Sequence, residues 1–248
     1  MARLRAAGCV FAEDEARLLT SAANSPDQLD ALAARRIAGE PLEYLLGWVE
    51  FAGLRLAVEP GVFVPRQRTQ LLVAETLRVL PAGGIVAELC CGVGAVSAAV
   101  LAARPDVELH AVDIDPVAVR CARRNLGERA SVYEGDLYSV LPESLRGRVD
   151  VLVANAPYVP SEAIAQMPPE ARLHEPRVAL DGGPDGLDVH RRVAAAAPDW
   201  LGAVGRLVIE TSRLQAARTA ELATRAGLLA RTVRDEELDA TAVVAVGP

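Results

Sequence analysis

Histidine and cysteine are scarce in this sequence, with three and four copies among 248 residues. Cys90 and Cys91 are neighbours, and none of the cysteines has partners at the spacing of a metal site or a disulfide framework. We therefore expect a reduced protein that holds no metal ion. A basic excess is missing as well, because the formal net charge is −7 at pH 7. Phosphate neutralisation needs a basic face, so this charge argues against a nucleic-acid duplex as the main partner, although a local basic patch stays compatible with it.

A long apolar run is also absent. Arg3 and Arg5 are followed by a short apolar stretch at 6–12, which meets acidic residues at 13–15 before it reaches the length of a secretory signal. The longest uncharged apolar run of the helical regions, 95–103, is less than half of a bilayer span. We expect a cytoplasmic protein without a membrane anchor.

The first part of the chain has helical character. Apolar residues recur at helical spacing over the first forty residues, and Ser25 followed by Pro26 is typical of a helix start. In the stretch 47–64, apolar residues are interrupted by turn residues, which predicts a β-hairpin. A connecting helix is predicted over 69–80.

A regular alternation of strands and helices begins at residue 84. The expected strands lie at 85–89, 107–112, 130–133, 149–154, 206–210, 228–233 and 241–246, and the expected helices at 94–104, 116–126, 187–201 and 214–226. Strands that are apolar throughout and alternate with helices predict a doubly wound α/β fold, with a mostly parallel seven-stranded sheet covered on both faces. No helix separates the last two strands, so the last one should run antiparallel to its neighbour. The chain then divides into a small helical module at 1–46, a hairpin linker at 47–66 and a main domain at 67–248.

A glycine turn follows the first strand of this domain and opens directly into a helix. Gly92 and Gly94 allow a ligand to approach the backbone closely, and the start of the helix offers unpaired N–H groups. Asp113 ends the second strand about 20 residues further on, where a carboxylate can accept both hydroxyls of a ribose. Asp136 follows the third strand and is placed to accept the amino group of an adenine. Each carboxylate alone is equally consistent with helix capping or turn chemistry, but their position at successive strand ends favours a nucleoside site.

Two further features indicate which nucleoside this is. Ser97 stands where a dinucleotide fingerprint has its third glycine, whereas the acidic Glu88 stands at the beginning of the turn. The fourth strand ends in the tetrapeptide Asn155-Ala156-Pro157-Tyr158, at 155–158. Together these features favour S-adenosylmethionine over NAD as the cofactor.

The tetrapeptide suits a planar amide as the methyl acceptor. An amide nitrogen is a poor nucleophile because its lone pair is delocalised into the carbonyl, so its N–H groups must be held and the lone pair aimed. The Asn155 side-chain oxygen and the Ala156 main-chain carbonyl can each accept one hydrogen. Pro157 biases Ala156 toward an extended backbone, and Tyr158 supplies a flat face. Catalysis would then be positioning for in-line attack, with no general base needed before transfer.

The alternative interpretation is that the tetrapeptide is only a turn after a buried strand, since asparagine and proline commonly interrupt regular structure. Its place at the carboxyl end of the fourth strand of a nucleoside-binding half favours the functional interpretation.

With these residues the chain resembles the protein-(glutamine-N5) methyltransferases that modify peptide chain release factors. The resemblance runs from about residue 39 to the C-terminus. It is carried by stretches at 41–47, 64–66, 88–94, 111–113, 155–158 and 174–187. The long last stretch, combined with the tetrapeptide, separates this family from DNA adenine methyltransferases.

The resemblance implies a class I S-adenosylmethionine-dependent methyltransferase that modifies a glutamine side chain in a release factor. The acceptor amide would be held by Asn155, Ala156, Pro157 and Tyr158, and the N-terminal helices would help to hold the protein substrate. The implied cofactor-binding residues are Glu88, Cys90, Cys91, Gly92, Gly94, Asp113, Ile114, Asp136, Leu137 and Asn155.

The sequence departs from the family pattern at several points. Ala156 replaces the first of two prolines, and Cys90 replaces the first glycine of the cofactor turn. Arg68 and Gln70 stand where the family has acidic residues, Leu137 stands where an aromatic residue is often found, and the helical module is short. The chain could therefore be a diverged paralogue of this family. Two other functions also stay open. One is methyl transfer to an exocyclic amine of a nucleic-acid base or to a small metabolite, and the other is cofactor binding without catalysis.

Overall fold

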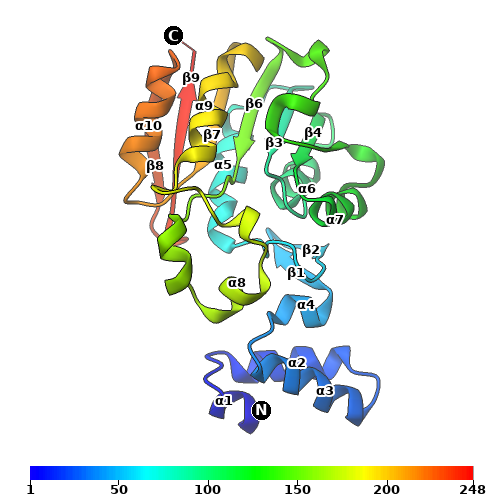
Figure 1. Cartoon of the computed structure of the whole chain (residues 1–248). Helices are drawn as coiled ribbons and strands as arrows, with labels where there is room; N and C mark the ends of the chain where they lie inside the picture. Colours follow the sequence, from blue (N-terminus) through cyan, green and yellow to red (C-terminus); the bar gives the residue numbers. More distant parts are fainter. Residues whose placement is uncertain (248) are drawn as a thin grey trace.

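The computed structural model describes residues 1–247 and contains a sheet-based body with a group of helices at one end (Figure 1). The N-terminal helices are α1 (Ala2–Ala6), α2 (Ala12–Ala22), α3 (Pro26–Ile37) and α4 (Leu42–Leu46). Helix α3 begins as its sequence predicts, because the Ser25 side chain accepts a hydrogen bond from the Gln28 N–H at 3.2 Å and Pro26 occupies the first turn. Strands β1 (Trp48–Phe51) and β2 (Leu54–Ala57) then form the expected antiparallel hairpin.

Seven strands form the main sheet, in the order β5-β4-β3-β6-β7-β9-β8. Their bounds are Ile85–Leu89 (β3), Glu108–Asp113 (β4), Ser131–Glu134 (β5), Val149–Ala154 (β6), Leu201–Glu210 (β7), Leu229–Asp235 (β8) and Ala240–Val246 (β9). Strands β3 to β7 pair in parallel, whereas β9 pairs antiparallel with both β7 and β8. The predicted seven-stranded doubly wound fold is therefore confirmed, including the antiparallel last strand. Strand order turns back between β3 and β6, which is where such sheets place their ligand crevice.

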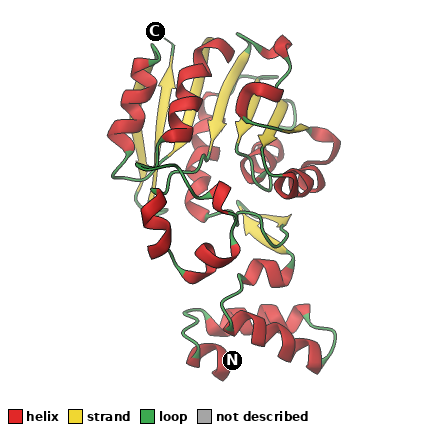
Figure 2. Cartoon of the chain, viewed as in Figure 1, coloured by secondary structure: helices red, strands yellow, loops and turns green. Residues whose placement is uncertain are grey.

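Helices cover both faces of the sheet (Figure 2). They are α5 (Gln70–Val79), α6 (Ala95–Ala103), α7 (Pro116–Leu126), α9 (Asp188–Trp200) and α10 (Ala216–Arg225), with the short α8 (Pro169–His174) in the loop after β6. Buried side chains of α5, α6 and α7 form one apolar core with one face of the sheet. Those of α9 and α10 form a second core on the other face. Burial on both faces explains why the central strands are apolar throughout.

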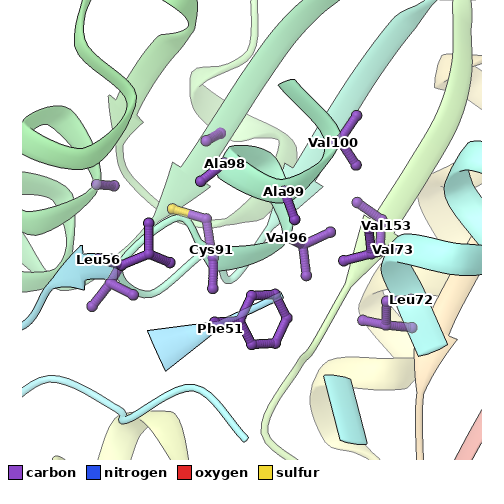
Figure 3. Close-up of a cluster of buried hydrophobic side chains, with 14 of the residues drawn as sticks. Phe51, Leu56, Leu72, Val73, Cys91, Val96, Ala98, Ala99, Val100 and Val153 are labelled. Atoms are coloured by element: carbon purple, nitrogen blue, oxygen red, sulfur yellow. The ribbon is translucent and has the colours of Figure 1, made fainter. Parts of the chain in front are cut away.

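The hairpin belongs to the first of these cores. Phe51 at the end of β1 has no exposed surface, and Figure 3 shows its ring among side chains such as Val96 of α6 and Leu72 of α5. Burying an aromatic side chain of this size stabilises a fold by about 2 kcal/mol. The hairpin is thus held in a fixed place beside the carboxyl ends of the strands.

The N-terminal helices have a separate, smaller apolar cluster, formed by Leu4, Ala12, Leu19 and Leu32. A buried ion pair joins α2 to α3, where the Arg36 guanidinium donates to both carboxylate oxygens of Glu15 at 2.7 and 3.0 Å. The division of the chain at residues 46 and 66 stays a prediction.

Strand β7 is longer than the sequence predicts. The expected strand covers 206–210, but β7 begins at Leu201, which pairs with Val149 before a shift of register. Glycines at 202 and 205 interrupt the apolar pattern of this stretch, so hydrophobic periodicity does not predict the extension. Gly205 is needed there, because a Cβ atom would lie 2.6 Å from the Val149 carbonyl oxygen.

Candidate active site

One cavity of about 210 Å³ opens at the carboxyl ends of the central strands. It is lined by the glycine turn after β3, the end of β4, the loop after β5 and the tetrapeptide after β6. The predicted site residues that line it are Glu88, Cys90, Cys91, Gly92, Asp113, Ile114, Asp136, Leu137, Asn155, Ala156, Pro157 and Tyr158. Residues that are distant in the sequence therefore meet at one crevice, and Gly94 alone among the predicted set lies outside the lining.

The two glycines of the turn have different surroundings. A Cβ atom added to Gly92 would meet no atom within 4 Å, so this residue leaves open space beside the backbone. A Cβ atom on Gly94 would instead lie 3.0 Å from Cδ1 of Leu126 in α7. Gly94 is therefore explained by helix packing, whereas Gly92 keeps the cradle open. Cys90 also has a left-handed backbone, with φ 56°, although it carries a side chain.

Asp113 is placed both to stabilise the turn and to bind a ribose, the two roles that the sequence leaves open. Its Oδ2 accepts the Gly92 N–H at 2.8 Å, and its Oδ1 accepts the Asp115 N–H at 2.9 Å. Asp115 in turn caps helix α7 by accepting the Val117 N–H at 2.7 Å. A carboxylate has about four acceptor positions, so Asp113 can hold the glycine turn and still accept hydroxyls in the cavity. Burial raises the pKa of Asp113.

The loop after β5 forms the far side of the cavity. The Asp136 carboxylate accepts a hydrogen bond from Arg192 of α9 at 2.6 Å, and both side chains line the cavity. Leu137 is buried with a left-handed backbone, while Ile114 is about half exposed. Arg192 was not expected at the site, because nothing in its helical stretch distinguishes it from an ordinary surface arginine.

Glu88 is a buried acid beneath the glycine turn. Its Oε2 accepts hydrogen bonds from the N–H of Ser97, at 2.9 Å, and from the Ser97 hydroxyl. Ser97 lies in the first turn of α6, whose N–H groups lack partners within the helix. Burial raises the pKa of Glu88 to about 7.

Asn155 is held by a residue that the sequence did not single out. Its Nδ2 donates to the hydroxyl of Thr69 at 3.3 Å, and Thr69 is 3% exposed at the start of α5. Because the amide nitrogen of Asn155 is engaged, its oxygen is the group left for the cavity. The neighbouring Ala156 is buried, and Pro157 follows it in the lining.

Tyr158 is anchored at its phenol oxygen. It donates to the Glu210 Oε1 at 3.2 Å, while Arg68 donates to the phenol oxygen at 3.0 Å and to the same glutamate oxygen at 3.3 Å. Glu210 is 3% exposed, and its Oε2 has no hydrogen-bond partner among residues 1–247. Burial raises the pKa of Tyr158 to about 12. Arg68, which departs from the family pattern, thus supplies the positive charge beside a buried acid. Glu210 ends β7, and a carboxylate at a strand end is the signal that could have identified it.

Two of the stretches that carry the resemblance meet beside this cavity. The Arg66 guanidinium donates to both oxygens of Glu175 at 2.7 Å, and Glu175 also accepts the Val64 N–H at 3.1 Å. A second cavity, between α4 and α8, shares Arg66, Arg68 and Met167 with the first. The two cavities therefore adjoin, and the second faces the N-terminal helices.

The described chain lacks two other kinds of feature. Among residues 1–247, no helix combines the length and apolar character that a bilayer crossing requires. The same part of the chain contains no cluster of three or more His, Cys, Asp or Glu side chains arranged to hold a metal ion.

Comparison with known proteins agrees with this geometry. The model of the methyltransferase small domain family matches residues 53–181. A methyltransferase structure from Pyrococcus furiosus superposes with a TM-score of 0.60 at 16% identity, covering 87% of this chain and 98% of that one, which shows a shared fold.

Sequence relatives are more specific. The release factor glutamine methyltransferase of Geobacter sulfurreducens is 38% identical over 209 residues, which are 82% of this chain and 72% of the relative. The protein of the same name from Mycolicibacterium smegmatis is 38% identical over 221 residues, 86% of this chain and 78% of the relative. At this identity and coverage, the chain belongs to the release factor glutamine methyltransferase family.

Proposed function

We propose that this protein transfers a methyl group from S-adenosylmethionine to the side-chain amide nitrogen of a glutamine in a peptide chain release factor. The observation that carries the proposal is the shared cavity, in which the glycine turn, Asp113 and the tetrapeptide 155–158 face one space. The relatives named above act on release factors by their names, and this supports the same substrate here.

The residues that line the cavity suit this cofactor. The open space at Gly92 allows a ligand to reach the backbone, and Asp113 keeps acceptor positions for ribose hydroxyls. Asp136 would accept the adenine amino group, with Arg192 fixing its carboxylate. Glu88, Cys90, Cys91, Ile114 and Leu137 would complete the pocket. When bound, S-adenosylmethionine supplies an electrophilic methyl group.

The tetrapeptide would hold the acceptor amide. The Asn155 oxygen and the Ala156 carbonyl oxygen would each accept one amide hydrogen, which aims the nitrogen lone pair. The Tyr158 ring, fixed at its hydroxyl by Glu210 and Arg68, would cover the flat amide. Transfer then depends on positioning rather than on prior deprotonation.

We assign residues 1–46 to recognition of the protein substrate. The cavity that faces these helices shares Arg66, Arg68 and Met167 with the cavity of the tetrapeptide, so a polypeptide bound there would lie next to the acceptor site. This arrangement favours an acceptor glutamine within a larger protein over a small metabolite.

The first test is transfer of labelled methyl from S-adenosylmethionine to purified release factor, with mass spectrometry of the modified residue. We expect the label on one glutamine side chain. A protein that binds the cofactor but labels only nucleic acid or small molecules would refute the proposed acceptor.

A pair of variants tests the division of roles. Asn155→Ala should lower turnover about 100- to 10,000-fold, as loss of a positioning contact does, while cofactor affinity changes little. Asp113→Ala should chiefly weaken cofactor binding. Calorimetric binding and single-turnover rates separate the two effects, and equal losses in both quantities for both variants would contradict the assignment.

A further inference from the structure

A fully buried histidine lies beneath the tetrapeptide. His190, in helix α9, has no exposed surface, and its ring centroid is 6.3 Å from that of Tyr158. The Ala156 backbone acts on the ring in the direction that raises the pKa of His190. Its Nδ1 is 3.2 Å from the Thr219 hydroxyl, while Nε2 has no completed hydrogen bond among the described residues. An unpaired buried ring nitrogen is costly, so its place in the fold calls for an explanation.

A chain of two buried hydroxyls reaches the His190 ring at Nδ1. The hydroxyl oxygens of Thr211 and Thr219 are 3.1 Å apart, and the Thr219 hydroxyl is in turn hydrogen-bonded to Nδ1 of His190. Because Nδ1 is taken by Thr219, Nε2 is the ring nitrogen that remains available to the Ala156 backbone. If Nε2 faces the Ala156 carbonyl oxygen it must carry the hydrogen, because a bare nitrogen would repel the oxygen, and Nδ1 then accepts from Thr219. Donation then runs in one direction, from Thr211 through Thr219 and His190 toward Ala156.

Burial lowers the pKa of His190 to about 4, so the ring is neutral at pH 7. It therefore acts on its surroundings through a directed N–H group, without placing a positive charge beside the acceptor site.

We propose that His190 is a positioning residue that fixes the Ala156 carbonyl as the second acceptor of the substrate amide, an inference that rests on the proposed function. Ala156 stands where the family pattern has a proline, so its backbone lacks the restraint of a ring. A carbonyl oxygen has two lone pairs. One can accept from Nε2 of His190, and the other then accepts the amide hydrogen of the substrate.

Variants of His190 distinguish this role from simple packing. In His190→Gln the side-chain nitrogen reaches the place of Nε2, so the donor toward Ala156 is kept. In His190→Asn the nitrogen reaches only the place of Nδ1, and in His190→Phe the ring volume is kept without any donor. Thr219→Val breaks the hydroxyl chain, and Thr219→Ser preserves it.

Single-turnover methyl transfer to release factor is the measurement, with cofactor affinity and melting temperature recorded for each variant. We expect His190→Phe and His190→Asn to lose roughly 10- to 100-fold in the transfer rate, since small misplacement of reacting groups has effects of this size. His190→Gln should retain most of the rate, and Thr219→Val should lose more than Thr219→Ser. Cofactor affinity should stay the same throughout.

Equal rates in wild type and His190→Phe would overturn the inference and leave the proposed function intact. So would rates that follow melting temperature alone, with the Gln variant as slow as the Phe variant. A wild-type protein that labels no glutamine would instead reject the proposed function itself.

Discussion

At the scale of single residues, the cofactor turn contains one residue, Cys90, whose backbone conformation is unfavourable for a side chain. Cys90 has φ 56°, a conformation that costs a residue with a side chain about 1–2 kcal/mol. The same turn uses glycine at Gly92 and Gly94, where positive φ values are free of this cost. Cys90 therefore occupies a position whose backbone suits glycine.

A pair of variants measures this cost. Both Cys90→Ala and Cys90→Gly remove the thiol and differ only in the Cβ methyl group, so their difference reports the cost of a side chain on this backbone. Alanine is normally the more stable of the two, because glycine loses more conformational entropy on folding. Here we expect Cys90→Gly to be more stable than Cys90→Ala by about 1 kcal/mol, measured by urea unfolding. The reverse order would show that the turn relaxes to accept a side chain.

Most of the candidate site was predictable at this scale, and the exceptions share a cause. Asp113, Asp136 and Asn155 were identified because each follows a predicted strand, and parallel strands end at one edge of the sheet. Thr69 bonds to Asn155 and His190 bonds to Thr219, and both partners are far away in the sequence. Periodicity and turn chemistry report only on local neighbours, so such contacts cannot be inferred from one sequence.

At the scale of elements, Glu88 joins strand β3 to helix α6. Its carboxyl accepts the Ser97 N–H and hydroxyl, and burial raises its pKa to about 7, above the ordinary 4.5. The folded state then binds more protons than the unfolded state between about pH 4.5 and pH 7. Stability linked to Glu88 is present below the lower value and is lost as the pH rises through the upper one.

Glu88→Gln should remove this dependence. The free energy of unfolding of the wild type should fall relative to that of Glu88→Gln by roughly 3 kcal/mol between pH 4.5 and pH 8, since one pKa unit corresponds to about 1.36 kcal/mol. The exposed Glu128, changed to Gln, is a matched control whose curve should stay parallel to the wild type. Denaturant titrations over this pH range check the result, and parallel curves for Glu88→Gln would show that the acid is ionised in the fold throughout.

Element types were predictable where the pattern is long and regular. The stretch 116–126 begins with proline after a capping aspartate, and helix α7 has these bounds. The segment between 160 and 180 contains short 3₁₀ turns and helix α8, separated by prolines, and has no periodic run to recognise. Its position is determined by tertiary contacts, such as the pairing of Glu175 with Arg66.

At the scale of the whole molecule, one guanidinium ties the N-terminal helices to the acceptor side. Besides Glu15, Arg36 donates to Glu170 of α8 at 2.5 Å and to the Glu40 carbonyl at 3.2 Å. Helix α8 borders the second cavity, which Met167 shares with the active-site cavity. This contact with the loop after β6 therefore helps to set the orientation of the N-terminal module relative to the acceptor site.

Glu170→Gln should loosen this attachment and leave the buried Arg36–Glu15 pair in place. If residues 1–46 hold the protein substrate, the KM for intact release factor should rise several-fold, because half-exposed ion pairs contribute about 1 kcal/mol. The KM for a short peptide that carries only the acceptor glutamine should not change, because such a peptide is too short to reach the module. Glu162→Gln, at an exposed acid in the same loop, should change neither value. A parallel rise for peptide and protein would place the effect in the acceptor cavity, and the module would then have no part in substrate recognition.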